Sequence, residues 1–197
     1  KAIYTHEWLM VPQENNAYYW PQRNEIVFPA GILQAPYYDP AADMASNYGE
    51  IGATIGHEMS HGYDDQGRKS DSKGMLRDWW TKEDAARYTA EAQKLVKQYN
   101  TYEPVKGLHI NGQQTLGENS ADLAGLIIAY DAYKIALGGK EAPVIEGLTG
   151  DQRFFLAYGQ SWRTKYREER LRDLVVSNVH SPAEARVNGA VRNVDAW

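Results

Sequence analysis

Two of the five histidines in this sequence lie four residues apart, in the stretch IGHEMSHGYDDQG that spans residues 55–67. On an α-helix, His57 and His61 would lie on one face one turn apart, so both imidazoles could bind one metal ion. Glu58 would lie beside that face, where it could take a proton from a zinc-bound water. The HExxH pattern therefore predicts a zinc hydrolase. Chance produces this pattern in about one in a hundred sequences of this composition, so the rest of a zinc site must be found elsewhere in the chain.

A catalytic zinc ion usually has a third protein ligand, which can come from two places. The HExxHxxGxxH pattern requires Gly and His where this chain has Asp64 and Gly67, so that arrangement is excluded. The other arrangement takes a glutamate from a second helix, and the stretch GENSADLAGL supplies Glu118 and Asp122 on one helical face. Two acids on an otherwise apolar helix are costly to bury without a partner, and zinc would be that partner.

A carboxylate often accepts a hydrogen bond from the second ring nitrogen of a zinc-binding histidine and so orients the ring. Asp122, one turn after Glu118, and Asp64, three residues after His61, are the candidates for this role. The alternative for both residues is a solvated acid in a loop or on a helix surface.

The composition excludes several classes of function. The net charge is −5 and the Lys and Arg residues are scattered, so we expect neither nucleic-acid binding nor membrane contact within this piece. The sequence has no cysteine, so any zinc must be held by His and carboxylate. The acidic stretch DDQGRKSDSKG fails the EF-hand pattern at its fifth and sixth positions, which argues against that type of calcium site.

One domain of 197 residues must position these side chains. Short alternating runs broken by Pro and Gly predict small strands within residues 16–38, and residues 64–78 form a polar loop. We expect Asp151 to cap the fourth predicted helix, and Ser181 with Glu184 has the capping-box pattern for the last. The predicted helices cover about residues 47–64, 81–100, 117–137, 147–169 and 182–193.

Four stretches of the chain resemble, in order and rough spacing, the motifs of the neprilysin / endothelin-converting-enzyme family of zinc metallopeptidases. They are NAYYWPQRNEIVFPAGILQ, HEMSHGYDDQGR, GENSADLAGL and VHSPAEARVNG. Bacterial members are the most similar in kind, because the cysteines typical of animal relatives are absent. The resemblance implies an α+β fold: a mainly helical, thermolysin-like (gluzincin) catalytic domain over residues 1–197, with a small β-sheet near the N-terminus.

The resemblance also implies roles for the residues that bind metal and carry out the chemistry. His57, His61 and Glu118 match the family's ligands for one Zn²⁺ per chain, and Glu58 matches its general base. Asp122 matches the acid that orients a ligand histidine and is sometimes described as a proton donor.

Further matches concern the substrate. His180 matches the histidine that stabilises the tetrahedral oxyanion, and Arg186 matches the arginine that binds a substrate carbonyl. A structural histidine and a helix-surface arginine are the alternatives. Four more residues match positions that bind the peptide backbone (Asn16 and Ala17) or line the pocket for the residue after the scissile bond (Ile32 and Trp162). His6 and His109 match no family position.

We therefore expect a zinc endopeptidase that hydrolyses oligopeptides on the amino side of hydrophobic residues. The alternatives are an inactive relative that binds peptides or partners, and an aminopeptidase, for which no amine-binding site is found. The resemblance implies an extracytoplasmic location, at a bacterial cell surface, in the periplasm or secreted. The abrupt ends of the chain suggest a fragment that lacks the family's last C-terminal segment and its N-terminal helical region, which is the expected partner within the same protein.

Overall fold

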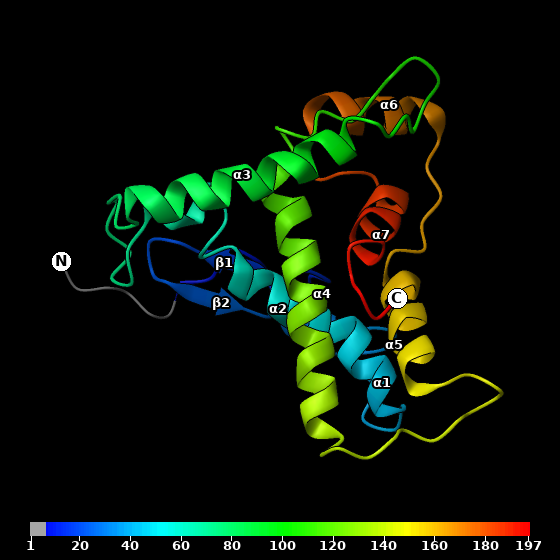
Figure 1. Cartoon of the computed structure of the whole chain (residues 1–197). Helices are drawn as coiled ribbons and strands as arrows, with labels where there is room; N and C mark the ends of the chain where they lie inside the picture. The colour runs from blue at the N-terminus through cyan, green and yellow to red at the C-terminus, as the bar shows by residue number, and fades with distance from the viewer. Residues whose placement is uncertain (1–6) are drawn as a thin grey trace.

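The computed structural model describes residues 7–197, so His6 lies outside the described residues. The chain forms a small sheet near its N-terminus and is otherwise mainly helical, which confirms the predicted α+β fold class (Figure 1). Strand β1 (Tyr18–Trp20) pairs antiparallel with β2 (Glu25–Val27). The α-helices are α1 (Met44–Asn47), α2 (Ala53–Ser60), α3 (Lys82–Tyr99), α4 (Leu116–Ala136), α5 (Gly150–Ser161), α6 (Glu168–Ser177) and α7 (Ala183–Val191).

A single helical rod leads to the HExxH stretch. It begins with α1, continues through one π-helical segment, η2 (Tyr48–Gly52), and ends with α2. Two short 3-10 helices, η1 (Ala30–Ile32) and η3 (Gly67–Lys69), lie in the loops on either side of the rod. The rod starts earlier and ends earlier than the predicted helix, and its π-helical segment has no simple signature in the spacing of apolar residues.

Helix α4 runs through the middle of the molecule and crosses α2 (Figure 1). The two backbones touch at a pair of glycines. A Cβ atom on Gly56 would lie 2.7 Å from the carbonyl oxygen of Gly125, and a Cβ atom on Gly125 would lie 2.5 Å from the backbone nitrogen of His57. Only glycine at both positions permits this approach, which brings the HExxH face against the acidic face of α4.

The main core lies where α4 meets α1, α2, α5 and α7. Leu126, Ala129 and Tyr133 of α4 pack there against Phe154 and other apolar residues of α5, and all of these side chains are buried. Burial of this apolar surface stabilises the crossing of the helices.

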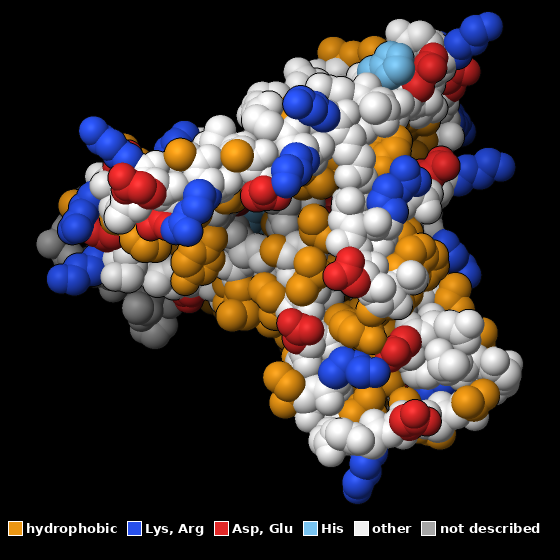
Figure 2. Space-filling view, viewed as in Figure 1, with side chains coloured by type: hydrophobic (Ala, Val, Ile, Leu, Met, Phe, Trp, Pro, Cys, Tyr) orange, Lys and Arg blue, Asp and Glu red, His pale blue; other side chains and the backbone are white. Residues whose placement is uncertain are grey.

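Apolar side chains also remain on the surface of this part of the chain. Ile127, Ile128 and Ile135 of α4 are exposed, and hydrophobic side chains gather over the middle of the view in Figure 2. Lys and Arg side chains are spread around that face rather than gathered in one patch (Figure 2). Within residues 7–197, no helix combines the length and apolarity needed to cross a membrane.

The start and length of α5 differ from the prediction. Thr149, not Asp151, caps the helix: the Thr149 side chain accepts from the backbone N–H of Gln152, whose own side chain accepts from the backbone N–H of Thr149. Asp151 instead accepts hydrogen bonds from Tyr130 and Lys134 of α4. The helix ends at Ser161, so the predicted helix over residues 147–169 is wrong beyond residue 161, and α6 begins as a separate element at Glu168.

The predicted capping box of α7 is also wrong. The Ser181 hydroxyl donates to Asn119 Oδ1 of α4 at 2.7 Å, and no side chain caps the helix. Both Ser181 and Asn119 are buried. A long-range hydrogen bond between buried groups has therefore replaced the local cap, because an unpaired amide in the core would be costly.

We predict that Gly125→Ala destabilises the protein by about 3 kcal/mol or more, because the new methyl group would overlap the backbone of α2. Gly159→Ala is the matched control in α5: its Cβ would lie 3.8 Å from Val187 Cγ1, an ordinary contact. The free energy of unfolding of the control should rise by about 0.5–1 kcal/mol, because alanine has the higher helix propensity. Thermal unfolding followed by circular dichroism measures both changes. An equal rise in melting temperature for the two variants would contradict the glycine contact.

Candidate active site

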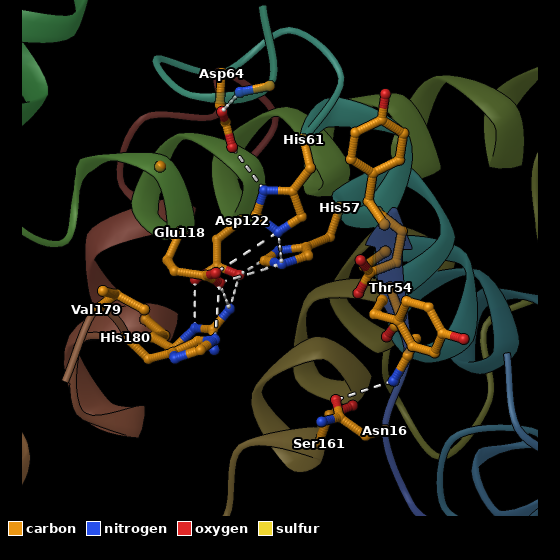
Figure 3. A pocket seen from close by; sticks show the side chains of 18 of the residues that line it. Asn16, Thr54, His57, His61, Asp64, Glu118, Asp122, Ser161, Val179 and His180 are labelled. Carbon is orange, nitrogen blue, oxygen red and sulfur yellow. Dashed lines mark hydrogen bonds and ion pairs between the residues drawn. The ribbon is translucent and has the colours of Figure 1, made fainter. Parts of the chain in front are cut away.

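One cavity of about 990 Å³ lies between the sheet, α2, α4, the end of α5 and the start of α7 (Figure 3). All the site residues predicted from the sequence line this cavity. They are Asn16, Ala17, Ile32, His57, Glu58, His61, Asp64, Glu118, Asp122, Trp162, His180 and Arg186. His109 is not among the lining residues and lies 4.0 Å from Glu103 in an exposed loop.

His57 of α2 and His61, the residue directly after this helix, direct one ring nitrogen each toward the same point. His57 Nδ1 lies 2.9 Å from Asp122 Oδ1, and His61 Nδ1 lies 2.7 Å from Asp64 Oδ2 (Figure 3). An ionised carboxylate only accepts hydrogen bonds, so both Nδ1 atoms are donors, and in the neutral form of each ring Nε2 is the nitrogen that carries the lone pair. The Nε2 atoms lie 3.0 Å apart. With both rings neutral, two facing lone pairs would repel each other, and a cation between them would remove that repulsion.

Glu118 of α4 supplies the third donor. Its Oε2 lies 3.3 Å from His57 Nε2, and its Oε1 lies 3.7 Å from His61 Nε2. Ligand atoms about 2.0–2.1 Å from a tetrahedral zinc ion lie about 3.3 Å from one another. The separations of the three donors therefore fit zinc, and two imidazoles with one carboxylate are a ligand set that zinc accepts.

Glu58 is buried beside these donors and faces the cavity. One of its carboxylate oxygens lies within 4.8 Å of a ring nitrogen of each histidine, farther than the closest oxygens of Glu118. The geometry thus favours Glu118 over Glu58 as the third ligand. Burial raises the pKa of Glu58, while the positive charges of His57 and His61 oppose that rise. A carboxyl group with a raised pKa holds a proton more strongly than an ordinary carboxylate does, which suits a group that accepts a proton and later returns it.

Asp64 connects the end of α2 to the following loop. Its Oδ2 contacts His61 Nδ1, while its Oδ1 accepts hydrogen bonds from the backbone N–H groups of Gln66 and Gly67 at 2.9 and 2.7 Å. These contacts hold the carboxylate in place, and the carboxylate in turn fixes the orientation of the His61 ring.

Arg186 of α7 forms the strongest ion pair of the cavity. Its Nε and Nη2 each lie 2.6 Å from an oxygen of Asp122, and Nη2 also lies 3.4 Å from Glu118 Oε2. Arg186 and Asp122 are both buried. Burial would raise the pKa of Asp122, but the charge of Arg186 and the hydrogen bond from His57 lower it. Arg186 therefore keeps Asp122 ionised in a place where a lone carboxylate would be protonated.

The Glu118 carboxylate has the same kind of support. Burial would raise its pKa, but hydrogen bonds from His180 and His57 and the charge of Arg186 hold its pKa well below the usual range. His180 lies just before α7 and reaches Glu118 Oε2 with Nε2 at 3.2 Å. Asn178 Oδ1 lies 2.8 Å from His180 Nδ1 and orients the ring, half of whose surface is open to solvent.

The remaining predicted residues line other walls of the same cavity. Asn16 and Ala17 directly precede β1, and Asn16 Oδ1 accepts the backbone N–H of Ala17 at 2.9 Å. Ile32 is buried and packs against Ala17. The Trp162 ring lies under the Arg186 guanidinium, with 4.0 Å between the guanidinium carbon and the ring centroid.

Glu50, Thr54 and Ser161 are among the polar residues of the cavity that sequence reasoning missed. Glu50 is only 4% exposed, and burial raises its pKa to about 7. The four-residue spacing of Glu50, Thr54 and Glu58 places them along one helical face. That spacing was the available signal, but the π-helical segment makes the face at Glu50 hard to predict from sequence.

The chain matches the model of one protein family, and it is similar to known proteins and to solved structures. The model of peptidase family M13 matches residues 16–197. Endothelin-converting enzyme 1 of Rattus norvegicus is 44% identical over 197 residues, which cover 98% of this chain and 26% of that protein. The human enzyme of the same name is 43% identical over the same length. The chain thus spans about a quarter of the length of these relatives.

Solved structures share the fold. The crystal structure of Mycobacterium tuberculosis zinc metalloprotease Zmp1 in complex with an inhibitor has a TM-score of 0.96 and 52% identity, covering 98% of this chain and 30% of that one. The crystal structure of PepO from Lactobacillus rhamnosis has a TM-score of 0.86 and 40% identity, covering 97% of this chain and 29% of that one. Both similarities extend over nearly the whole of this chain.

The raised pKa of Glu50 predicts how stability changes with pH. The folded protein holds the Glu50 proton up to about pH 7, whereas the ordinary value is 4.5. The contribution of Glu50 to the free energy of unfolding therefore falls as pH rises from about 4.5 to 7 and is constant above that. Relative to that of wild type, the free energy of unfolding of Glu50→Gln should rise by on the order of 2 kcal/mol between pH 5 and pH 8. Denaturant unfolding at both pH values measures this, and a pH-independent difference would contradict it.

Proposed function

This chain belongs to peptidase family M13, and from that premise we propose that it is the catalytic part of a zinc-dependent endopeptidase that hydrolyses oligopeptides. One observation carries the proposal. The Nε2 atoms of His57 and His61 and the carboxylate of Glu118 converge with separations of 3.0 to 3.7 Å. Both Nδ1 atoms are held by carboxylates, which is the usual support for a zinc-binding histidine.

His57, His61 and Glu118 hold one Zn²⁺ in this proposal. Zinc, when bound, supplies Lewis acidity that polarises a peptide carbonyl and makes a nearby water easier to deprotonate. Asp122 and Asp64 keep the two imidazoles in the tautomer and orientation that binding requires. The ion pair between Arg186 and Asp122 supports this by keeping Asp122 ionised.

Glu58 is the general base and then the general acid. It takes a proton from the attacking water and delivers that proton to the nitrogen of the departing amine. Its burial beside the donors and its raised pKa support both steps. A contribution of about a hundred- to ten-thousandfold to the rate is typical of such a group.

His180 and Arg186 stabilise the oxyanion and bind the substrate carbonyl. His180 is half exposed at the edge of the cavity, so its ring can approach a bound peptide. Arg186 uses Nε and Nη2 on Asp122, and its Nη1 has no hydrogen-bond partner among residues 7–197 and is not fully enclosed. A preorganised donor of this kind stabilises charge that develops during the reaction.

The peptide binds along the N-terminal β region. Asn16 and Ala17 lie at the start of β1, where an extended peptide can form backbone hydrogen bonds. Ile32 and Trp162 form walls of the pocket for the residue after the scissile bond, which favours hydrophobic residues there. The protein acts outside the cytoplasm, and an N-terminal helical region of the same protein covers the cleft.

We predict that Glu58→Gln retains about one zinc per chain but loses peptide cleavage by a factor of about a hundred or more. Glu118→Gln should instead weaken zinc binding, because the amide is a poorer ligand than the carboxylate. Metal analysis after gel filtration and cleavage of a quenched peptide library measure the two properties. The exposed Glu83→Gln is the matched control and should leave both properties unchanged.

Equal activity of wild type and Glu58→Gln would contradict the assigned base. Zinc bound without cleavage in any variant would favour an inactive relative that binds peptides. A wild-type protein that binds no zinc would contradict the central proposal.

A further inference from the structure

Glu50 is a buried acid without a cation. It is 4% exposed, and no Lys, Arg or His of residues 7–197 forms an ion pair with it. Among the described residues, its side chain makes one hydrogen bond, a long one from Gln160 Nε2 to Oε1 at 3.4 Å. Burying a carboxylate that lacks a charged partner is costly, so such a group in an enclosed place attracts a cation strongly.

The free oxygen of Glu50 opens into the cavity. Oε2 accepts no hydrogen bond from the described residues, yet it is not among their fully enclosed unpaired atoms. Glu50 is one of the residues that line the cavity. The carboxyl group is therefore buried from bulk water but accessible to a molecule that fills the cleft.

The surroundings of Glu50 belong to the proposed pocket for the residue after the scissile bond. Gln160, which contacts Glu50, lies two residues before Trp162. Ile51, the next residue after Glu50, packs against Ile32. Ala53 also lines the cavity. A side chain that enters between Ile32 and Trp162 thus passes apolar walls and reaches an acid at the end.

Glu50 lies too far from the proposed reacting groups to take part in bond cleavage. The distance is one that a long substrate side chain can span. Glu50 and Glu58 are eight residues apart on one helical rod, which corresponds to roughly 12 Å. Figure 3 shows Thr54, midway between them, on the opposite side of the view from Glu118 and His180. Glu50 therefore lies beyond the reacting groups, where the far end of a long side chain would be.

Resting on the proposed function, we propose that Glu50 is a specificity-determining residue that selects lysine or arginine immediately after the scissile bond. The methylene groups of such a side chain lie along Ile32 and Trp162, and its positive end pairs with the Glu50 carboxylate. Basic residues thereby join the hydrophobic residues that the apolar walls accept. Lys and Arg commonly bury their stems against apolar surface while a polar partner holds the charged end.

The electrostatics of the pocket agree with this assignment. Burial raises the pKa of Glu50 to about 7, and no charged group of the described residues contributes to the shift. A bound ammonium or guanidinium favours the ionised carboxylate and would lower that pKa. Preference for the basic side chain should therefore increase from pH 6 to pH 8.

The test compares two peptides that differ only in the residue after the scissile bond, lysine or norleucine. Norleucine has a similar straight stem without the charge. The intact zinc-loaded protein, its Glu50→Gln variant and the exposed-site control Glu141→Gln are assayed for kcat/KM at pH 6 and pH 8. Glu50→Gln should lower the lysine-to-norleucine ratio at pH 8 by about tenfold or more, the loss expected for one charge-assisted hydrogen bond. Glu141→Gln should keep the wild-type ratio and its pH dependence.

An unchanged ratio in folded Glu50→Gln would overturn the proposal, and so would a wild-type ratio that does not rise with pH. If wild type cleaves neither peptide, the proposed function fails separately. In that case calorimetric binding of the same two peptides decides the role of Glu50. Tighter binding of the lysine peptide that is lost in Glu50→Gln would support the assignment, and equal binding would overturn it.

Discussion

The contact between Gly56 and Gly125 determines how the side chains of the cavity come together. It lets the backbones of α2 and α4 touch, so that side chains on the two helices meet without an intervening layer of core residues. The donors of His57 and His61 can then reach Glu118 and Asp122 directly. A pair of alanines would separate the helices, and the four side chains would lose their common point. The site is in this sense a property of helix packing as much as of its polar residues.

The charges that gather at this crossing require compensation. Two carboxylates on α4 face the imidazoles at the C-terminal end of α2, and Arg186 of α7 brings a permanent positive charge to both acids. The arginine also stacks on Trp162, so the same side chain connects α4, α7 and the end of α5. The ion pairs therefore fix the position of α7, and with it the approach of His180 to Glu118. The ion pairs that balance the buried charges thus also hold these helices in place.

Much of the site could be predicted because its signals are local or follow a helical period. The spacing of His57 and His61, and of Glu118 and Asp122, depends only on the pitch of an α-helix. The acid at Glu50 could not be assigned in this way, because a π-helical segment changes the face on which it lies. Ser181 and Asp151 were predicted as caps from local patterns, whereas each pairs with a residue of α4. Such long-range partners leave no mark in the neighbouring sequence.

The π-helical segment Tyr48–Gly52 has a consequence for how this protein can change during evolution. A π-helical turn contains one residue more than the α-helical turn it replaces. Deleting one residue there would restore an ordinary α-helical turn, so α1 and α2 would keep their relative orientation while the residues within that turn change the face they present. The surroundings of Glu50 in the cavity would then change, while His57, Glu58 and His61 would stay in place. One deletion would thus alter the lining of the cavity without disturbing the HExxH face, so these two parts of a single helix can diverge independently.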